Sequence, residues 1–139
     1  MRALFSFATA ALVAGCGVDT VDPVGAWHVG IIPDPAAPAA PSCTMAYPDP
    51  EVWIVEPDRV SGPTLDSATV AIGLTCEATR CQLSIREDID YEPDVHQTIA
   101  RTYVLDDRDQ ITGAGSIQVT APESTCALHF TVVGYRDPL

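Results

Sequence analysis

Apolar and polar residues alternate with a period of two along most of this chain of 139 residues. In an extended strand this period places every second side chain on one face, whereas a helix requires a period near 3.6. The alternation is clearest in the segment ITGAGSIQVT (111–120), whose inward positions are predicted to be Ile111, Gly113, Gly115, Ile117 and Val119. No segment beyond residue 15 has a helical period. The sequence therefore predicts an all-β domain.

Eight segments have the alternation expected of strands. They are 27–31, 43–47, 51–56, 70–76, 81–85, 96–106, 111–120 and 126–132. Three stretches are expected to be loops: the proline-rich 32–42, then 57–67, and the acidic 88–94. The buried face of the sixth strand is ambiguous, because Arg101 interrupts its apolar positions. Eight sequential antiparallel strands favour an up-and-down barrel, with a two-sheet β-sandwich as the alternative.

The first fifteen residues, MRALFSFATAALVAG, have the layout of a signal peptide. They begin with a cationic Arg2, continue with an apolar run and end in small residues, and the run is too short for a permanent membrane span. Val13-Ala14-Gly15-Cys16 resembles the lipobox of bacterial lipoproteins. The resemblance implies cleavage before Cys16 and a diacylglyceryl group on its sulfur. An ordinary signal peptide followed by an unrelated cysteine is the alternative.

This resemblance implies three parts of the chain: a signal peptide (1–15), a lipidated N-terminus with a short tether (16–24) and a single β domain (25–139). Two acyl chains are enough for stable attachment to a membrane. In lipoproteins of Gram-negative cells, an aspartate after the lipidated cysteine can retain the protein in the inner membrane. Here Gly17 follows Cys16. We therefore expect an exported protein anchored in the bacterial cell envelope, with the outer membrane favoured.

The four other cysteines form an even set, as expected in an oxidising compartment. Apolar residues alternate up to Cys76 and again from Cys81, and residues 77–80 fit the loop of a hairpin. Directly opposed residues of a hairpin lie close to disulfide distance. We therefore pair Cys76 with Cys81 and, by elimination, Cys43 with Cys126. A zinc site is disfavoured because these spacings do not match the common zinc-binding patterns.

Gly25-Ala26-Trp27, at the start of the first predicted strand, resembles the Gly-x-Trp motif of the lipocalins. In that family an arginine of the last strand packs over the tryptophan, and Arg136 has the matching position and parity here. The long proline-rich loop after the first strand is similar to the large first loop of lipocalins. The chain departs from the family in its short domain, in lacking a TDY-type motif and in lacking a helix after the barrel. The resemblance implies a barrel that binds a small apolar ligand.

The chain is strongly acidic, with a formal net charge of −12 and no lysine. Removal of residues 1–15 would leave six basic residues against 19 acidic ones, a formal charge of −13. Such a surface repels nucleic acid, because it has no cationic face to displace the counterions of the phosphates. A solvated surface is the simplest interpretation, and a docking face for a basic partner is the alternative.

We predict no catalytic residue, resident metal or cofactor. His28 and His129 lie on the outer faces of the two terminal strands, where they would approach each other if those strands pair. His96 lies beside the acidic loop, where Asp94 could orient it, but no nucleophile accompanies it. The acidic residues of 87–94, with those of 106–109, could collect calcium. A plain acidic surface is favoured, because the spacing lacks the glycine and final glutamate of an EF-hand.

Three functions from different classes remain. The first is a non-catalytic envelope lipoprotein with a binding or structural β domain. The second is a carrier of a small apolar ligand, as the lipocalin resemblance implies. The third is an inhibitor of a basic envelope enzyme such as lysozyme, because strong negative charge would steer a cationic enzyme to this domain.

Overall fold

The computed structural model describes residues 20–39 and 43–137, which form an all-β domain of eight antiparallel strands in a nearly closed barrel. The strands are β1 (Gly25–Pro33), β2 (Glu51–Glu56), β3 (Arg59–Ser61), β4 (Thr69–Cys76), β5 (Arg80–Glu92), β6 (Val95–Asp106), β7 (Gln110–Ala121) and β8 (Ser124–Asp137). The predicted fold class is therefore confirmed. Nowhere in these two ranges is there a helix long and apolar enough to cross a membrane.

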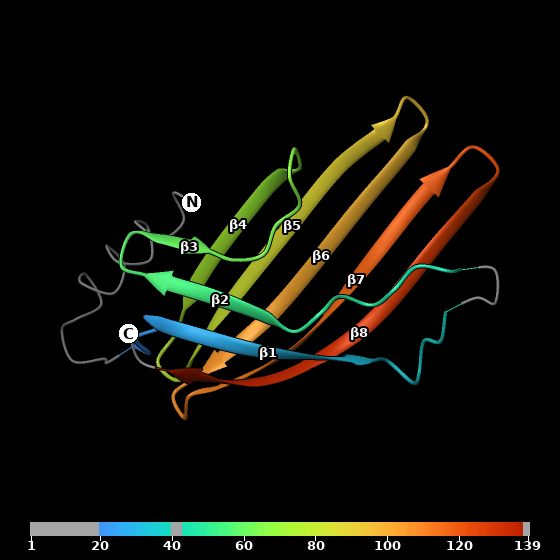
Figure 1. The fold of residues 1–139 in the computed structure, drawn as a ribbon. Helices are drawn as coiled ribbons and strands as arrows, with labels where there is room; N and C mark the ends of the chain where they lie inside the picture. Colours follow the sequence, from blue (N-terminus) through green and yellow to red (C-terminus); the bar gives the residue numbers. More distant parts are fainter. Residues whose placement is uncertain (1–19, 40–42, 138–139) are drawn as a thin grey trace.

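The strand order is β3-β2-β1-β8-β7-β6-β5-β4. Strands β4 to β8 follow the order of the chain, and β1 continues the sheet by pairing with β8, with Trp27 opposite Arg136. Figure 1 shows that β5 to β8 are long and that β1 and β2 lie across one end of them. The barrel is open between the short edge strand β3 and the other edge strand, β4.

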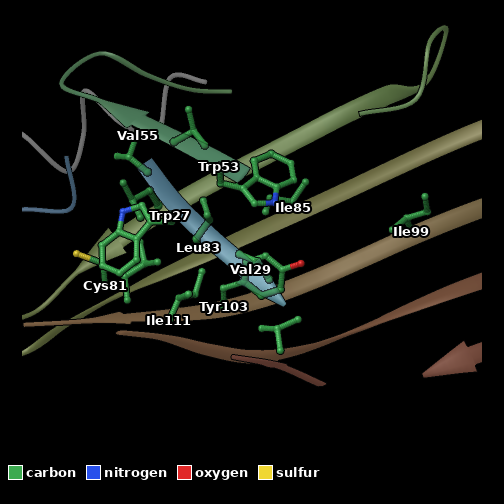
Figure 2. Close-up of a cluster of buried hydrophobic side chains, with 14 of the residues drawn as sticks. Trp27, Val29, Trp53, Val55, Cys81, Leu83, Ile85, Ile99, Tyr103 and Ile111 are labelled. Atoms are coloured by element: carbon green, nitrogen blue, oxygen red, sulfur yellow. The ribbon is translucent and has the colours of Figure 1, made fainter. Parts of the chain in front are cut away.

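The core lies where β1 and β2 cross the long strands. Its largest buried side chains are Trp27, Trp53, Tyr103 and Phe130. Trp27 and Trp53 are register partners on β1 and β2, and they face Leu83 and its neighbours on β5 and β6 (Figure 2). Full burial of one large apolar side chain contributes about 1.5–3 kcal/mol. These positions follow the alternation that the sequence displays.

Gly115 on β7 leaves space for an aromatic side chain of the neighbouring strand β8. A Cβ at Gly115 would overlap the ring of Phe130, its register partner on β8, and would lie 2.9 Å from the carbonyl oxygen of Ala100 on β6. The absent side chain leaves the space that the aromatic ring fills. A larger residue at 115 would therefore displace the core of the barrel.

Two predicted segments differ from the structure. Residues 43–47, expected to be a strand, belong to an extended segment outside the sheet. Met45 and Tyr47 still pack against the core, so their alternation reflects one buried face without a hydrogen-bonded ladder. Conversely, the predicted loop 57–67 contains the three-residue strand β3, which is too short for its alternation to be recognised in the sequence.

The expected boundaries of two loops are also wrong. The proline-rich loop begins later than residue 32, because β1 continues to Pro33. The acidic segment 88–94 is not a loop: β5 continues to Glu92 and β6 starts at Val95. Asp88 is the register partner of Thr98, and its carboxylate accepts a hydrogen bond from that hydroxyl. The charged side chains thus occupy the outward face of a long hairpin.

The structure contains the two predicted disulfide bonds, Cys76–Cys81 and Cys43–Cys126. The first joins directly opposed residues of the β4–β5 hairpin. The second fastens the extended segment before β2 to β8. Residues 20–24, expected to form part of a tether, contact the barrel instead. Val21 is buried, and the backbone carbonyl of Pro23 accepts a hydrogen bond from the indole of Trp27.

Candidate functional site

Three charged side chains point into the barrel beside the core. Glu51 begins β2, Glu87 lies in β5 and Arg101 lies in β6, and each has the parity of the apolar residues on its own strand. Their exposed fractions are 4%, 1% and 5%. Buried charges are costly unless they are paired and hydrogen-bonded. The cluster is therefore the most unusual part of the interior.

Arg101 pairs with both glutamates. Its Nε and Nη2 atoms donate to Oε2 of Glu51 at 3.0 and 2.8 Å, and its Nη1 atom donates to Oε2 of Glu87. The guanidinium also lies over the ring of Trp53, with 5.3 Å between Cζ and the ring centroid. Burial by itself lowers the pKa of Arg101, but Glu51 and Glu87 outweigh this effect and the pKa lies above its usual value. Arg101 therefore remains a cation.

Glu51 also accepts hydrogen bonds from two aromatic residues of the core. Its Oε1 atom accepts from the hydroxyl of Tyr103 at 2.7 Å and from the indole nitrogen of Trp53 at 3.0 Å. Burial, together with the nearby carboxylate of Glu51, raises the pKa of Tyr103 above its ordinary value, so the phenol remains a donor. Among the described residues, no buried side-chain nitrogen or oxygen lacks a partner. The cluster is thus a satisfied, rigid polar network.

A pocket of about 330 Å³ opens beside this cluster. Its lining residues are Pro48, Asp49, Pro50, Glu51, Pro63, Thr64, Leu65, Glu87, Gln97, Ile99, Arg101 and Ile117. Figure 2 shows Ile99 on β6, farther along the barrel than Trp53 and Tyr103, and Ile99 belongs to the same buried cluster as these residues. Ligand pockets typically have volumes of about 300–1,000 Å³, apolar walls and a few placed polar groups. This pocket has those properties at the lower end of the size range.

Two connecting segments form walls of the pocket above the sheet. The segment before β2 contributes residues 48–50, and the disulfide Cys43–Cys126 holds its start against β8. The connection between β3 and β4 contributes residues 63–65. Its position is fixed because the backbone N–H of Leu65 donates to Oε1 of Glu87 at 2.6 Å. Glu87 therefore links the ion cluster to one wall of the pocket.

The sequence contains a signal for this site, but it is spread over three separate strands. Glu51 shares its parity with Trp53, and Glu87 shares its parity with Ile85. Each of the three charges is thus inward-facing, and Arg101 carries the charge opposite to that of the two glutamates. Recognising the cluster requires knowing that β2 crosses β5 and β6, which alternation alone does not supply. Arg101 is consequently not an interruption of the sixth strand but part of its buried face.

A second arginine occupies the other end of the core. The Cζ atom of Arg136 lies 4.9 Å from the ring centroid of Trp27, so the contact that the lipocalin resemblance implies is present. The guanidinium also donates to the backbone carbonyls of Asp22 and Val24, and to the carboxylate of Asp109. A Cβ at Gly25 would overlap the Arg136 side chain, and the positive φ of 152° there also favours glycine. These contacts connect Arg136 on β8 to the segment before β1 and to the β6–β7 turn.

The histidines lie outside both clusters. His28 bonds to Asp137 at 2.8 Å and stacks on Tyr135, its register partner. His129 is the register partner of Ser116 on β7, so the expected approach of His28 to His129 is wrong. In the β1–β8 register, His28 lies opposite Tyr135 rather than His129, so the two histidines are separated along β8. His96 contacts Asp90 rather than Asp94.

The acidic hairpin does not gather its carboxylates around one point. Glu87 is buried against Arg101, whereas Asp88 lies on the outer surface and pairs with Arg86 at 2.9 Å. Strand alternation therefore sends neighbouring carboxylates to opposite faces of the sheet. Over residues 20–39 and 43–137, no group of three or more histidine, cysteine, aspartate or glutamate side chains is arranged to hold a metal ion.

Comparison with known proteins returns no relatives: no protein-family model, no curated protein and no solved structure matches this chain. The predicted lipid anchor, Cys16, and the neighbouring Gly17 lie outside the described residues.

Proposed function

We propose that this protein is a non-catalytic, lipid-anchored binding protein of the bacterial cell envelope that holds a small amphipathic ligand in its barrel. The observation that carries the binding role is the pocket of about 330 Å³, with Pro48, Leu65, Ile99 and Ile117 among its apolar walls and a buried ion cluster at its base. Such a combination of apolar walls and few oriented polar groups is typical of ligand sites.

The two disulfide bonds support an exported location, because structural disulfides persist in oxidising compartments and are rare in the cytosol. The hydrogen bonding of the Glu51 carboxylate supports a binding role rather than a catalytic one. Glu51 accepts hydrogen bonds from Arg101, Tyr103 and Trp53, so it is held as a structural acceptor. A general base needs a lone pair directed at its substrate.

The pocket can be tested with octan-1-ol, a neutral amphiphile. We expect saturable binding that shifts the backbone amide resonances of Leu65, Ile99 and Ile117 in a nuclear magnetic resonance titration. Ile117→Trp should weaken binding by tenfold or more, because excluding only two methylene groups from the pocket costs about 1.6 kcal/mol. Gln118→Trp is the matched control, since residue 118 is exposed on the opposite face of β7. Equal binding by both variants, or shifts elsewhere on the barrel, would rule out this site.

The anchor can be tested separately with Cys16→Ser. We expect the variant to appear in the soluble fraction of the envelope, whereas the unaltered protein partitions with membranes, because the thioether-linked acyl chains supply the attachment. Circular dichroism and the urea midpoint of the released variant should match those of the unaltered domain. A Cys16→Ser protein that still sediments with membranes would contradict the proposed anchor.

A further inference from the structure

We propose that the ligand of the barrel pocket is a cationic amphiphile, with a protonated amine or quaternary ammonium head and an apolar tail of modest length. This inference rests on the proposed function, since it names the ligand class of the same pocket. It follows from the charges and hydrogen bonds of the residues that line the pocket.

The first step is the charge of the lining. Three acidic residues, Asp49, Glu51 and Glu87, and one basic residue, Arg101, line the pocket, which gives a formal charge of −2. The whole chain has a formal charge of −12, so the long-range field has the same sign as the local one. Both favour the entry of a cation and oppose the entry of an anion.

The second step is the state of the guanidinium. An arginine in an apolar pocket would ordinarily attract a carboxylate ligand, through two parallel hydrogen bonds. Here Nε, Nη1 and Nη2 of Arg101 already donate to Glu51 and Glu87. A carboxylate ligand that paired through Nε and Nη2 would have to displace Glu51 and leave it buried without its partner, which is costly. The pocket is therefore unsuited to fatty acids and similar anions.

The third step is the position of the one carboxylate of the lining that lies outside the ion cluster. Asp49 is exposed and lines the pocket on the wall held by Cys43–Cys126, so the head of an entering ligand can pair with it there. The apolar lining, including Ile99 and Ile117, is suited to a hydrocarbon tail. The volume of about 330 Å³ limits this tail to a short chain or a single ring.

The experiment compares octylammonium, octan-1-ol and octanoate, which share one tail and differ in the charge of the head. Equilibrium dialysis at pH 7 and low ionic strength would give the three dissociation constants. We expect octylammonium to bind about threefold to tenfold more tightly than octan-1-ol, and octanoate to bind most weakly, because the head meets the exposed carboxylate of Asp49 in a negatively charged lining. The advantage of octylammonium should shrink at 0.5 M salt, because the mouth of the pocket is open to screening.

Two charge-matched variants locate the effect. Asp49→Asn should weaken octylammonium binding about threefold to tenfold and leave octan-1-ol binding unchanged. Asp107→Asn removes the same charge from the exposed β6–β7 turn and should have little effect. Both residues are exposed, so neither substitution should disturb folding, and unchanged urea midpoints would verify this.

The outcomes separate the two proposals. If octan-1-ol does not bind, the proposed binding function fails. If octan-1-ol binds and octanoate binds as tightly as octylammonium, the function stands and the charge inference is overturned. Octylammonium binding that persists in Ile117→Trp would indicate adsorption to the acidic surface, and this also overturns the inference.

Discussion

Replacing Arg101 with methionine is expected to lower the free energy of unfolding by about 3–5 kcal/mol. The loss arises because Glu51 and Glu87 would remain buried without the cation that pairs with both, while the methionine recovers only part of the packing. Urea unfolding at pH 7, followed by circular dichroism, measures the change. Since a small domain has only about 5–15 kcal/mol of stability in total, this is among the largest effects available to one substitution.

The control is Arg86→Met on β5. Arg86 pairs with Asp88 on the outer surface, where solvent screens the interaction, so little change is expected. A similar loss from Arg86→Met and Arg101→Met would indicate that burial of the cluster is not the cause.

A further variant separates uncompensated charge from lost packing. Glu51→Gln and Glu87→Gln, added to Arg101→Met, remove every charge of the cluster. The glutamine side chains can still accept hydrogen bonds from Trp53, Tyr103 and the Leu65 backbone. We expect the triple variant to recover most of the stability that Arg101→Met loses. No recovery would mean that the guanidinium contributes mainly through its packing over Trp53.

Much of the fold could be predicted because a period of two determines which face of a strand is buried. Trp27, Leu83 and Phe130 are in the core as expected, since each follows the parity of its strand. The failures have specific physical causes. Residues 43–47 alternate but form no ladder, and Pro48 and Pro50, which follow them, have no N–H to donate. The acidic residues 88–92 were expected in a loop, yet an outward-facing strand position suits a carboxylate well.

The candidate site could not be predicted in the same way, because it depends on contacts between distant strands. Glu51 and Arg101 are separated by 50 positions, and only the crossing of β2 over β6 brings them together. A single charged residue at an inward position of a predicted strand is compatible with a wrongly assigned register, a β-bulge or a buried ion pair. The available signal was one arginine and two glutamates at inward positions, and only the topology shows that these three residues meet.

The second large effect is expected from the disulfide Cys43–Cys126. In the chain-entropy model, a bridge stabilises a protein more when it closes a longer loop. The separations are 83 residues for Cys43–Cys126 and 5 for Cys76–Cys81. These lengths correspond to about 4.5 and about 2 kcal/mol, respectively. Replacing each pair with alanines should therefore destabilise the domain unequally, and urea unfolding without reductant measures the two losses.

The structure gives a second reason to expect a larger loss of stability from removing Cys43–Cys126 than from removing Cys76–Cys81. Cys76 and Cys81 are already held opposite each other by the β4–β5 ladder, whereas residues 43–50 belong to no strand and depend on the bridge to β8. Removing Cys43–Cys126 should thus also loosen one wall of the pocket and weaken octan-1-ol binding, while removing Cys76–Cys81 should leave binding nearly unchanged. Cys81 is fully buried, so its replacement adds a packing loss that works against the predicted order. Equal losses from the two pairs, or a larger loss from Cys76–Cys81, would show that the long bridge joins segments already fixed by other contacts.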